Sequence, residues 1–339
     1  MSTTPVFQRV AIVGAGAIGG WMGVRLSHAG CTVSALARGE TLAALQRDGL
    51  QLHQDGQLQG APVAAAASAA TLGVQDLVIV AVKAPALAGL ARSIEPLIGR
   101  HTVVLTAMNG VPWWFFNGFG GERAGTRLQT VDPQGELERA IPARHVVGCV
   151  VHASCSVDAP GVIRHHFGNG LIIGEPSGEN SERVVALAGL LRRAGFDASV
   201  SPQIQKDVWY KLWGNMTVNP VSALTGATTD RIMDDDLVRG FISQVMLEAR
   251  EIGARLGIPI DQQPEDRHVL TRKLGAIKTS MLQDVEAGKP LELDALVSAV
   301  RELGQITQVP APFTDALLGL ARLKAQSLGL YPLPSVRQG

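Results

Sequence analysis

The sequence has little cysteine, no excess of either charge and no long apolar run. Its 339 residues include 3 cysteines, and none forms a C-x-x-C pair, which excludes a disulfide framework and argues against a cysteine zinc site. Lys+Arg and Asp+Glu number 30 each, so we expect no nucleic-acid partner held by bulk charge. No stretch reaches the roughly 18 apolar residues of a membrane helix, so we expect no membrane partner. A reducing cytoplasm is the expected location.

What the sequence does have is an ample supply of apolar residues, 46% of the total, enough to bury a large core. At about 100–200 residues per domain, the length suggests two domains, with three as the alternative. Short apolar runs alternate with helical patterns in the first half, and this predicts βαβ units and a mainly parallel sheet. The predicted strands are residues 9–13, 32–37, 76–82 and 102–106.

The second half has a different pattern, in which helical spacing is punctuated by prolines. The predicted helices are residues 203–225, 235–256, 267–287, 291–308 and 314–328. A change from a sheet-rich to an all-helical pattern predicts a domain boundary between residues 201 and 202. We therefore expect one domain over residues 1–201 and a helical domain over residues 202–339.

A glycine loop follows the first predicted strand and opens a predicted helix, as Gly14-Ala15-Gly16-Ala17-Ile18-Gly19. In a dinucleotide-binding loop the first glycine allows the tight turn, the second lets the backbone approach a pyrophosphate, and the third packs helix against strand. The anion then lies on the helix N-terminus. We predict an α/β, Rossmann-like dinucleotide-binding domain followed by an all-α domain. The alternative is a glycine-rich turn without a ligand.

The end of the second predicted strand indicates which dinucleotide is bound. An acidic residue there would bind the 2′-hydroxyl of NAD, but Arg38 occupies this stretch. A guanidinium suits a 2′-phosphate through paired hydrogen bonds, which favours NADP(H). Two alternatives stay open: Arg38 is a solvated residue at the end of the strand, or Glu40 binds the ribose instead.

Three polar residues, Lys211, Asn215 and Asn219, recur at intervals of four in a largely apolar predicted helix. At 3.6 residues per turn they lie along one face. Buried polar groups need partners, so this line suggests a binding site. The alternative is a solvent-facing stripe of an amphipathic helix. By themselves, Ser280 and Glu292 are ordinary helix-surface and first-turn residues.

Taken together, these residues resemble the ketopantoate reductase (2-dehydropantoate 2-reductase) family from the glycine loop to about residue 310. The most specific stretches are Lys211-Leu-Trp-Gly-Asn215-Met-Thr-Val-Asn219-Pro220, Thr279-Ser280-Met281-Leu282-Gln283-Asp284 and Leu291-Glu292-Leu293-Asp294. The family has a lysine, an asparagine and an arginine beside the cofactor where this chain has Val82-Lys83-Ala84, Met108-Asn109-Gly110 and Ala37-Arg38-Gly39.

The resemblance implies that NADPH reduces a 2-oxo acid to a 2-hydroxy acid, foremost 2-dehydropantoate to pantoate in pantothenate biosynthesis. Lys211 would be the general acid. Substrate binding would involve Asn215, Asn219 and Ser280. Asn109 would lie between the nicotinamide and the substrate. Lys83 would lie near the nicotinamide ribose, and Glu292 would lie at the edge of the ribose or of the substrate. The helical domain would bind the substrate, and the protein would be a monomer or homodimer. We expect no metal, because the histidines lack ligand spacing.

One segment departs from the family. Residues 113–119 contain five of the chain's 15 aromatic residues, where family members have a shorter and less aromatic stretch. It could line a larger substrate pocket, form a lid, contact another subunit, or be a buried hydrophobic anchor. Because of this segment, a paralogous reductase of another ketone or imine is the main alternative function. A non-catalytic NADP(H)-binding regulator is a further alternative.

Overall fold

The computed structural model describes residues 6–333 and divides the chain into two compact units. The first unit consists of Met1–Met108, Trp113–Arg127 and Asp132–Asp207, and the second of Asn109–Pro112, Leu128–Val131 and Val208–Gly339. The sequence placed a domain boundary between residues 201 and 202, close to the last change of unit. It did not indicate that two short segments of the first half join the helical unit. The predicted domains themselves stay a prediction.

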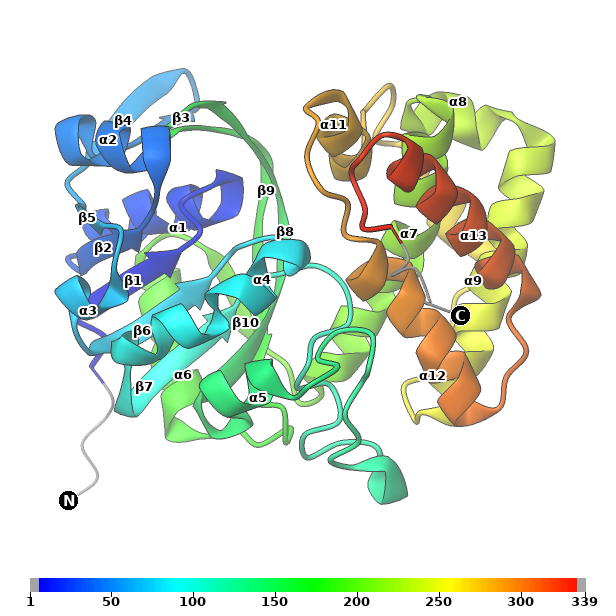
Figure 1. Cartoon of the computed structure of the whole chain (residues 1–339), viewed down its shortest axis with the longest axis horizontal. Helices are drawn as coiled ribbons and strands as arrows, with labels where there is room; N and C mark the ends of the chain where they lie inside the picture. The colour runs from blue at the N-terminus through cyan, green and yellow to red at the C-terminus, as the bar shows by residue number, and fades with distance from the viewer. Residues whose placement is uncertain (1–5, 334–339) are drawn as a thin grey trace. The chain divides into compact units, whose positions relative to one another are not determined.

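The first unit contains a ten-stranded sheet in the order β4-β3-β9-β8-β7-β6-β1-β2-β5, with β10 beside β9 (Figure 1). The strands are β1 (Arg9–Val13), β2 (Thr32–Leu36), β3 (Leu50–Gln54), β4 (Gln57–Ala61), β5 (Ala64–Ala66), β6 (Gln75–Val80), β7 (Ile98–Thr106), β8 (Val146–Ala159), β9 (Val162–Gly174) and β10 (Asp197–Val200). All pairs are parallel except β3 with β4 and β8 with β9. The prediction of a mainly parallel sheet is confirmed.

The helices of this unit are short, and the longest are α1 and α6 at 12 residues each. They are α1 (Ala17–His28), α2 (Gly39–Asp48), α3 (Ala69–Leu72), α4 (Ala84–Leu90), η1 (Ala91–Leu97), η2 (Gly121–Arg123), α5 (Glu136–Ala140), η3 (Ala143–His145) and α6 (Glu182–Arg193). Helix α1 contacts β1 and β2 as well as β3, β4 and β9, so the sheet curls around it. Glycines on α1 permit this approach: a Cβ at Gly20 would lie 2.4 Å from Ile163 of β9, and one at Gly23 would lie 2.7 Å from Leu50 of β3.

The second unit is helical, as predicted. Its elements are α7 (Ile204–Thr225), which begins in the first unit, α8 (Thr229–Asp234), α9 (Asp236–Arg255), α10 (Pro264–Arg272), α11 (Ser280–Glu286), the π-helical turn η4 (Asp294–Ser298), α12 (Ala299–Thr307) and α13 (Pro312–Ser327). Helix α7 buries Trp209 and Trp213. The indole Nε1 of Trp213 donates to the carbonyl oxygen of Met246 on α9 (2.7 Å), which joins the two longest helices.

One helix prediction was wrong. Residues 267–287 form two helices, α10 and α11, instead of one. Gly275 adopts φ +69° between them, a conformation that favours glycine and ends a helix. The side chain of Thr279 then caps α11 by accepting a hydrogen bond from the backbone N–H of Leu282 (3.2 Å). Helical periodicity continued through this break because both helices bury one face.

The aromatic segment is a buried anchor of the first unit. Trp113, Trp114, Phe115 and Phe116 are all at most 5% exposed. The indole of Trp114 donates to the hydroxyl of Thr106 (3.2 Å), and Phe115 and Phe116 pack edge to face at 5.3 Å. Of the four roles open from the sequence, these contacts support the hydrophobic anchor.

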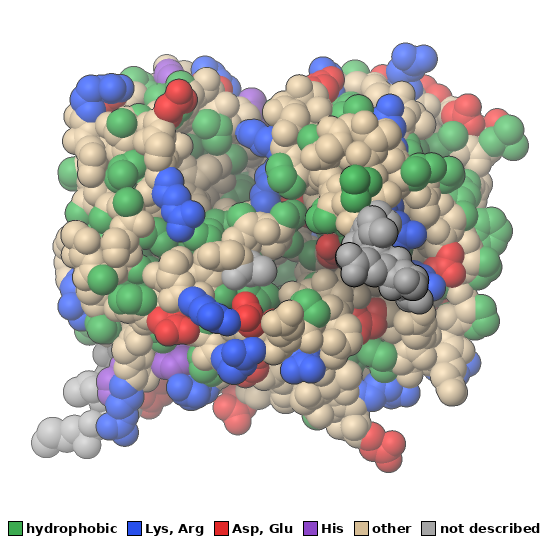
Figure 2. Space-filling view, in the orientation of Figure 1, with side chains coloured by type: hydrophobic (Ala, Val, Ile, Leu, Met, Phe, Trp, Pro, Cys, Tyr) green, Lys and Arg blue, Asp and Glu red, His purple; other side chains and the backbone are tan. Residues whose placement is uncertain are grey.

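The surface carries mixed charge. Figure 2 shows basic and acidic side chains interspersed over the drawn face of each unit, as expected from equal numbers of the two kinds. Scattered apolar side chains also reach the surface, among them Leu237 on α9 and Leu320 and Leu323 on α13. Within residues 6–333, none of the helices is long and apolar enough to span a membrane.

A buried histidine makes the stability of the helical unit depend on pH. His268 of α10 is 5% exposed, and its Nε2 lies 2.8 Å from the hydroxyl of Ser243 on α9. Burial lowers the pKa of His268 below its ordinary value. The unfolded chain therefore binds more protons, and the free energy of unfolding should fall as the pH drops below about 6.5. We expect His268→Gln to lessen this loss, measured by urea unfolding at pH 5 and pH 7.5. An equal loss in both proteins would contradict the assignment.

Candidate functional site

The glycine loop is shaped by close contacts within the first unit. Gly14 follows β1 with φ +97°, and a Cβ there would lie 2.9 Å from the carbonyl oxygen of Ala81. A Cβ at Gly19 would lie 2.1 Å from the carbonyl oxygen of Gly14. Both glycines are thus required by the turn and by the packing of α1 against β1, as the fingerprint predicts.

Gly16 has no such explanation within the described chain. Its φ is −84°, which any residue adopts, and a Cβ built on it meets no atom within 4 Å. Helix α1 begins at the next residue, and its first turn contains no acidic side chain. Free backbone N–H groups beside open space suit an anion at the helix N-terminus. The loop therefore fits the pyrophosphate of a dinucleotide.

Two further predicted residues lie at the same edge of the sheet. Arg38 follows β2 and precedes α2, and Lys83 follows β6 and precedes α4. Both are exposed, as is Glu40 in the first turn of α2. Strands β2, β1 and β6 are parallel neighbours, so their carboxyl ends coincide. The chain leaves β1 for β2 on one side and continues to β6 on the other. Dinucleotides bind at such a switch point in open α/β sheets.

The polar line on α7 is only partly open to solvent. Lys211 and Asn215 are half-buried, and Asn219 is 8% exposed. Trp209 and Trp213 occupy other sides of the same helix and are almost fully buried. A partly buried amine in line with two carboxamides is better suited to a polar ligand than to a solvated stripe.

The remaining predicted residues belong to the second unit but to different elements. Ser280 is the exposed first residue of α11, whereas Glu292 is buried and lies two residues before η4. Asn109 is half-buried, and its chain segment meets η4: the backbone N–H of Val111 donates to the carbonyl oxygen of Ala295 (2.8 Å). The structure thus brings two segments to the same turn, η4: the one that contains Asn109 is hydrogen-bonded to it, and the one that contains Glu292 leads into it.

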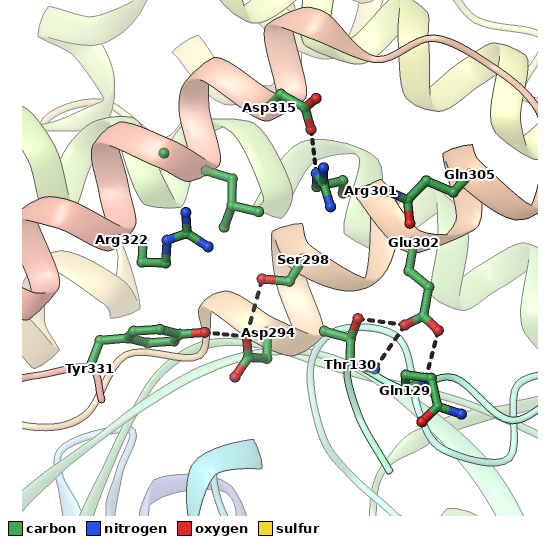
Figure 3. Close-up of a pocket in the computed structure, with 12 residues that line it drawn as sticks. Gln129, Thr130, Asp294, Ser298, Arg301, Glu302, Gln305, Asp315, Arg322 and Tyr331 are labelled. Atoms are coloured by element: carbon green, nitrogen blue, oxygen red, sulfur yellow. Dashed lines mark hydrogen bonds and ion pairs between the residues drawn. The ribbon is translucent and has the colours of Figure 1, made fainter. Parts of the chain in front are cut away.

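A polar cavity of about 660 Å³ lies in the second unit, between residues 129–130, η4, α12, α13 and Tyr331 (Figure 3). Its three carboxylates have hydrogen-bond partners. Asp315 accepts from Arg301 (2.6 Å), Glu302 accepts from the backbone N–H groups of residues 129 and 130 (2.6 and 2.8 Å), and Asp294 accepts from the hydroxyl of Tyr331 (2.6 Å). Burial, followed by the bond to Asp294, raises the pKa of Tyr331 well above its ordinary value.

Sequence reasoning did not single out these cavity residues as functional. In the sequence, Asp294 stands out only as the end of a motif, and Tyr331 and Glu302 belong to no motif. One signal was available for Tyr331, because the chain has only two tyrosines. For Glu302 the sequence offers no such signal, because its partners, Gln129 and Thr130, are 173 and 172 positions away along the chain.

Comparison with known proteins gives consistent matches along the chain. The family model "Ketopantoate reductase PanE/ApbA" matches residues 10–178, and "Ketopantoate reductase PanE/ApbA C terminal" matches residues 203–325. A 2-dehydropantoate 2-reductase from Mesorhizobium japonicum is 48% identical over 325 residues, which cover 96% of this chain and 100% of that protein.

Solved structures agree with these matches. The crystal structure of a candidate ketopantoate reductase from Ralstonia solanacearum is 57% identical, with a TM-score of 0.93, over 96% of this chain and 100% of that one. A D-mandelate dehydrogenase solved with NADH and anilino(oxo)acetate has a TM-score of 0.80 at 21% identity, over 95% of this chain and 99% of that one. At that identity the likeness shows the fold alone.

Proposed function

The chain belongs to the ketopantoate reductase family, and on this premise we propose that it reduces 2-dehydropantoate to pantoate with NADPH. Membership confirms the resemblance seen in the sequence. It makes the chain an oxidoreductase acting on CH–OH groups, in a family that typically uses NADP. The observation that carries the proposal is the partly buried line of Lys211, Asn215 and Asn219 on α7.

The first unit supplies the residues that bind the cofactor. In this proposal the loop Gly14–Gly19 holds the pyrophosphate on the N-terminus of α1, supported by the open space at Gly16. Arg38 binds the 2′-phosphate, and Lys83 lies at the nicotinamide ribose, supported by their position at the carboxyl ends of β2 and β6. Glu292 of the second unit lies at the ribose or substrate edge.

The second unit supplies the acid and the residues that orient the substrate. The cofactor, when bound, provides the hydride that is added to the C2 ketone. Lys211 stabilises the negative charge that develops on the ketone oxygen and donates the proton that completes the hydroxyl. The substrate is oriented by Asn109, Asn215, Asn219 and Ser280. Carboxamides suit this task because they donate and accept hydrogen bonds without adding charge beside the ammonium.

The main alternative is reduction of a different ketone or imine on the same scaffold. The sequence suggested it through the aromatic segment, residues 113–119. Burial of Trp113 to Phe116 within the first unit removes that argument for a bulkier substrate. A regulator without chemistry is also disfavoured, because binding NADP(H) alone would not require the polar line on α7.

The proposal is tested by following NADPH consumption by the purified protein with ketopantoate and, in parallel, with bulkier 2-oxo acids. We expect ketopantoate to have the highest kcat/KM, by about 10-fold or more, because a fitted pocket discriminates by at least this factor per misfitting group. Tight NADPH binding with little turnover of ketopantoate would contradict the substrate and favour the paralogous reductase.

Cofactor preference provides a separate test of Arg38. Arg38→Ala should lower the preference for NADPH over NADH by about 10- to 150-fold, because a charge-assisted hydrogen bond contributes about 1.5–3 kcal/mol. Titration with each dinucleotide measures the ratio of dissociation constants. Glu40→Gln is the matched control, since this residue is also exposed and lies two positions after Arg38. If Glu40→Gln changes this ratio and Arg38→Ala does not, the assignment of Arg38 is wrong and Glu40 binds the ribose instead.

The location, the oligomeric state and the reaction partner also stay predictions. The protein is expected in the cytoplasm, as a monomer or homodimer whose partner in the reaction is a small 2-oxo acid. Light scattering of the purified protein determines the oligomeric state directly.

A further inference from the structure

The segment that carries Glu292 is held on both sides by the C-terminal stretch of the chain. Before it, the backbone N–H of Leu291 donates to the carbonyl oxygen of Leu330 (3.1 Å). After it, the hydroxyl of Tyr331 donates to Oδ1 of Asp294 (2.6 Å). Two consecutive residues near the C-terminus therefore bracket the buried Glu292.

Asp294 begins the π-helical turn η4 and is held from two directions. The hydroxyl of Ser298 donates to the same Oδ1 (3.1 Å) from within the turn, and the hydroxyl of Tyr331 reaches it from the C-terminal stretch (Figure 3). Hydrogen bonds to a carboxylate are about twice as strong as those between neutral groups. The half-buried phenol thus restrains the start of η4, an irregular turn of the kind often found at functional sites.

The same turn supports the segment that follows Asn109. The carbonyl oxygen of Ala295 accepts from the backbone N–H of Val111 (2.8 Å). Gly110 makes the approach possible, since it has φ +87° and a Cβ there would lie 2.6 Å from that oxygen. A displacement of η4 would therefore also displace the backbone beside Asn109, which is hydrogen-bonded to this turn.

We propose that Tyr331 is a positioning residue, which holds Asp294 and thereby fixes the backbone of Glu292 and of the segment after Asn109. The inference rests on the proposed function, in which Glu292 and Asn109 contact the cofactor and substrate. Tyr331 acts through Asp294, which accepts its hydrogen bond. Loss of its hydroxyl should lower the affinity for NADPH and leave the proton donor, Lys211, in place.

Tyr331→Phe is the first test, because it removes the hydroxyl and keeps the ring. In the cofactor-free protein, we expect the backbone amides of residues 291–296 to exchange hydrogen faster. The NADPH dissociation constant should rise about 2- to 30-fold, the range for residues that act through a contact network, with a smaller change in kcat. Unchanged exchange of these amides would overturn the proposal.

Thr314→Val is the matched control. The hydroxyl of Thr314 also donates to a carboxylate of the second unit, Oε2 of Glu248 (2.7 Å), where that acid caps α13. This substitution should lower the melting temperature without changing NADPH affinity or exchange at residues 291–296. If Thr314→Val weakens NADPH binding as much as Tyr331→Phe does, the effect is general destabilisation and the proposal fails.

A double-mutant cycle with Glu292→Gln tests whether Tyr331 acts through Glu292. We expect Tyr331→Phe to weaken NADPH binding in the natural protein and to add little in the Glu292→Gln background. Equal effects in both backgrounds would overturn the proposed route. If Glu292→Gln alone leaves NADPH affinity unchanged, the role of Glu292 in the proposed function fails. Faster amide exchange in Tyr331→Phe then still supports the positioning of this backbone.

Discussion

Lys211→Ala should lower kcat by about 10²- to 10⁴-fold, the usual contribution of general acid catalysis. The substitution removes both the proton donor and the positive charge that stabilises the developing alkoxide. The NADPH dissociation constant should change little, because the proposed dinucleotide loop lies in the other unit. Steady-state kinetics with ketopantoate and a fluorescence titration with NADPH measure the two quantities separately.

Lys206→Ala is a matched control for this prediction. Lys206 is an exposed lysine on the same helix, α7, five positions earlier and on a different side. Its replacement should leave kcat unchanged. A small primary amine added to Lys211→Ala should restore part of the turnover if the missing group is an acid. Unchanged kcat in Lys211→Ala would show that another group donates the proton. An equal loss in Lys206→Ala would show that the effect is not specific to Lys211.

Gly16→Ala should weaken NADPH binding at least about 10-fold, or about 1.4 kcal/mol, while the protein stays folded. A methyl group at this position meets no protein atom within 4 Å, but it would occupy the space assigned to the pyrophosphate. The free energy of unfolding should change by less than about 1 kcal/mol, the modest difference between glycine and alanine at a helix N-cap. Titration with NADPH and urea unfolding measure the two effects.

Gly19→Ala is the contrasting variant of the same loop. Its Cβ would lie 2.1 Å from a backbone oxygen, so the loop must shift, and we expect a loss of about 1–3 kcal/mol in unfolding free energy. Together the two variants separate packing from ligand binding. NADPH binding by Gly16→Ala that matches the natural protein would favour the alternative of a glycine-rich turn without a ligand.

Much of the fold followed from local patterns. The strand predicted at residues 9–13 is β1, Arg9–Val13, and the helix predicted at residues 203–225 is α7, Ile204–Thr225. Periodicity failed where two helices with similar patterns are separated by a short break, at Gly275. Periodicity also could not determine the role of the aromatic segment, because an anchor, a lid and a pocket wall all have the same apolar composition.

The glycine loop and the polar line on α7 could be recognised from the sequence alone. Each depends only on spacing along one strand and turn or along one helix, which backbone geometry determines locally. The hydrogen bonds between Tyr331 and Asp294 and between Thr130 and Glu302 could be known only from the folded chain. These pairs are 37 and 172 positions apart. Contacts at such separations follow no period, since they depend on how whole helices and loops pack.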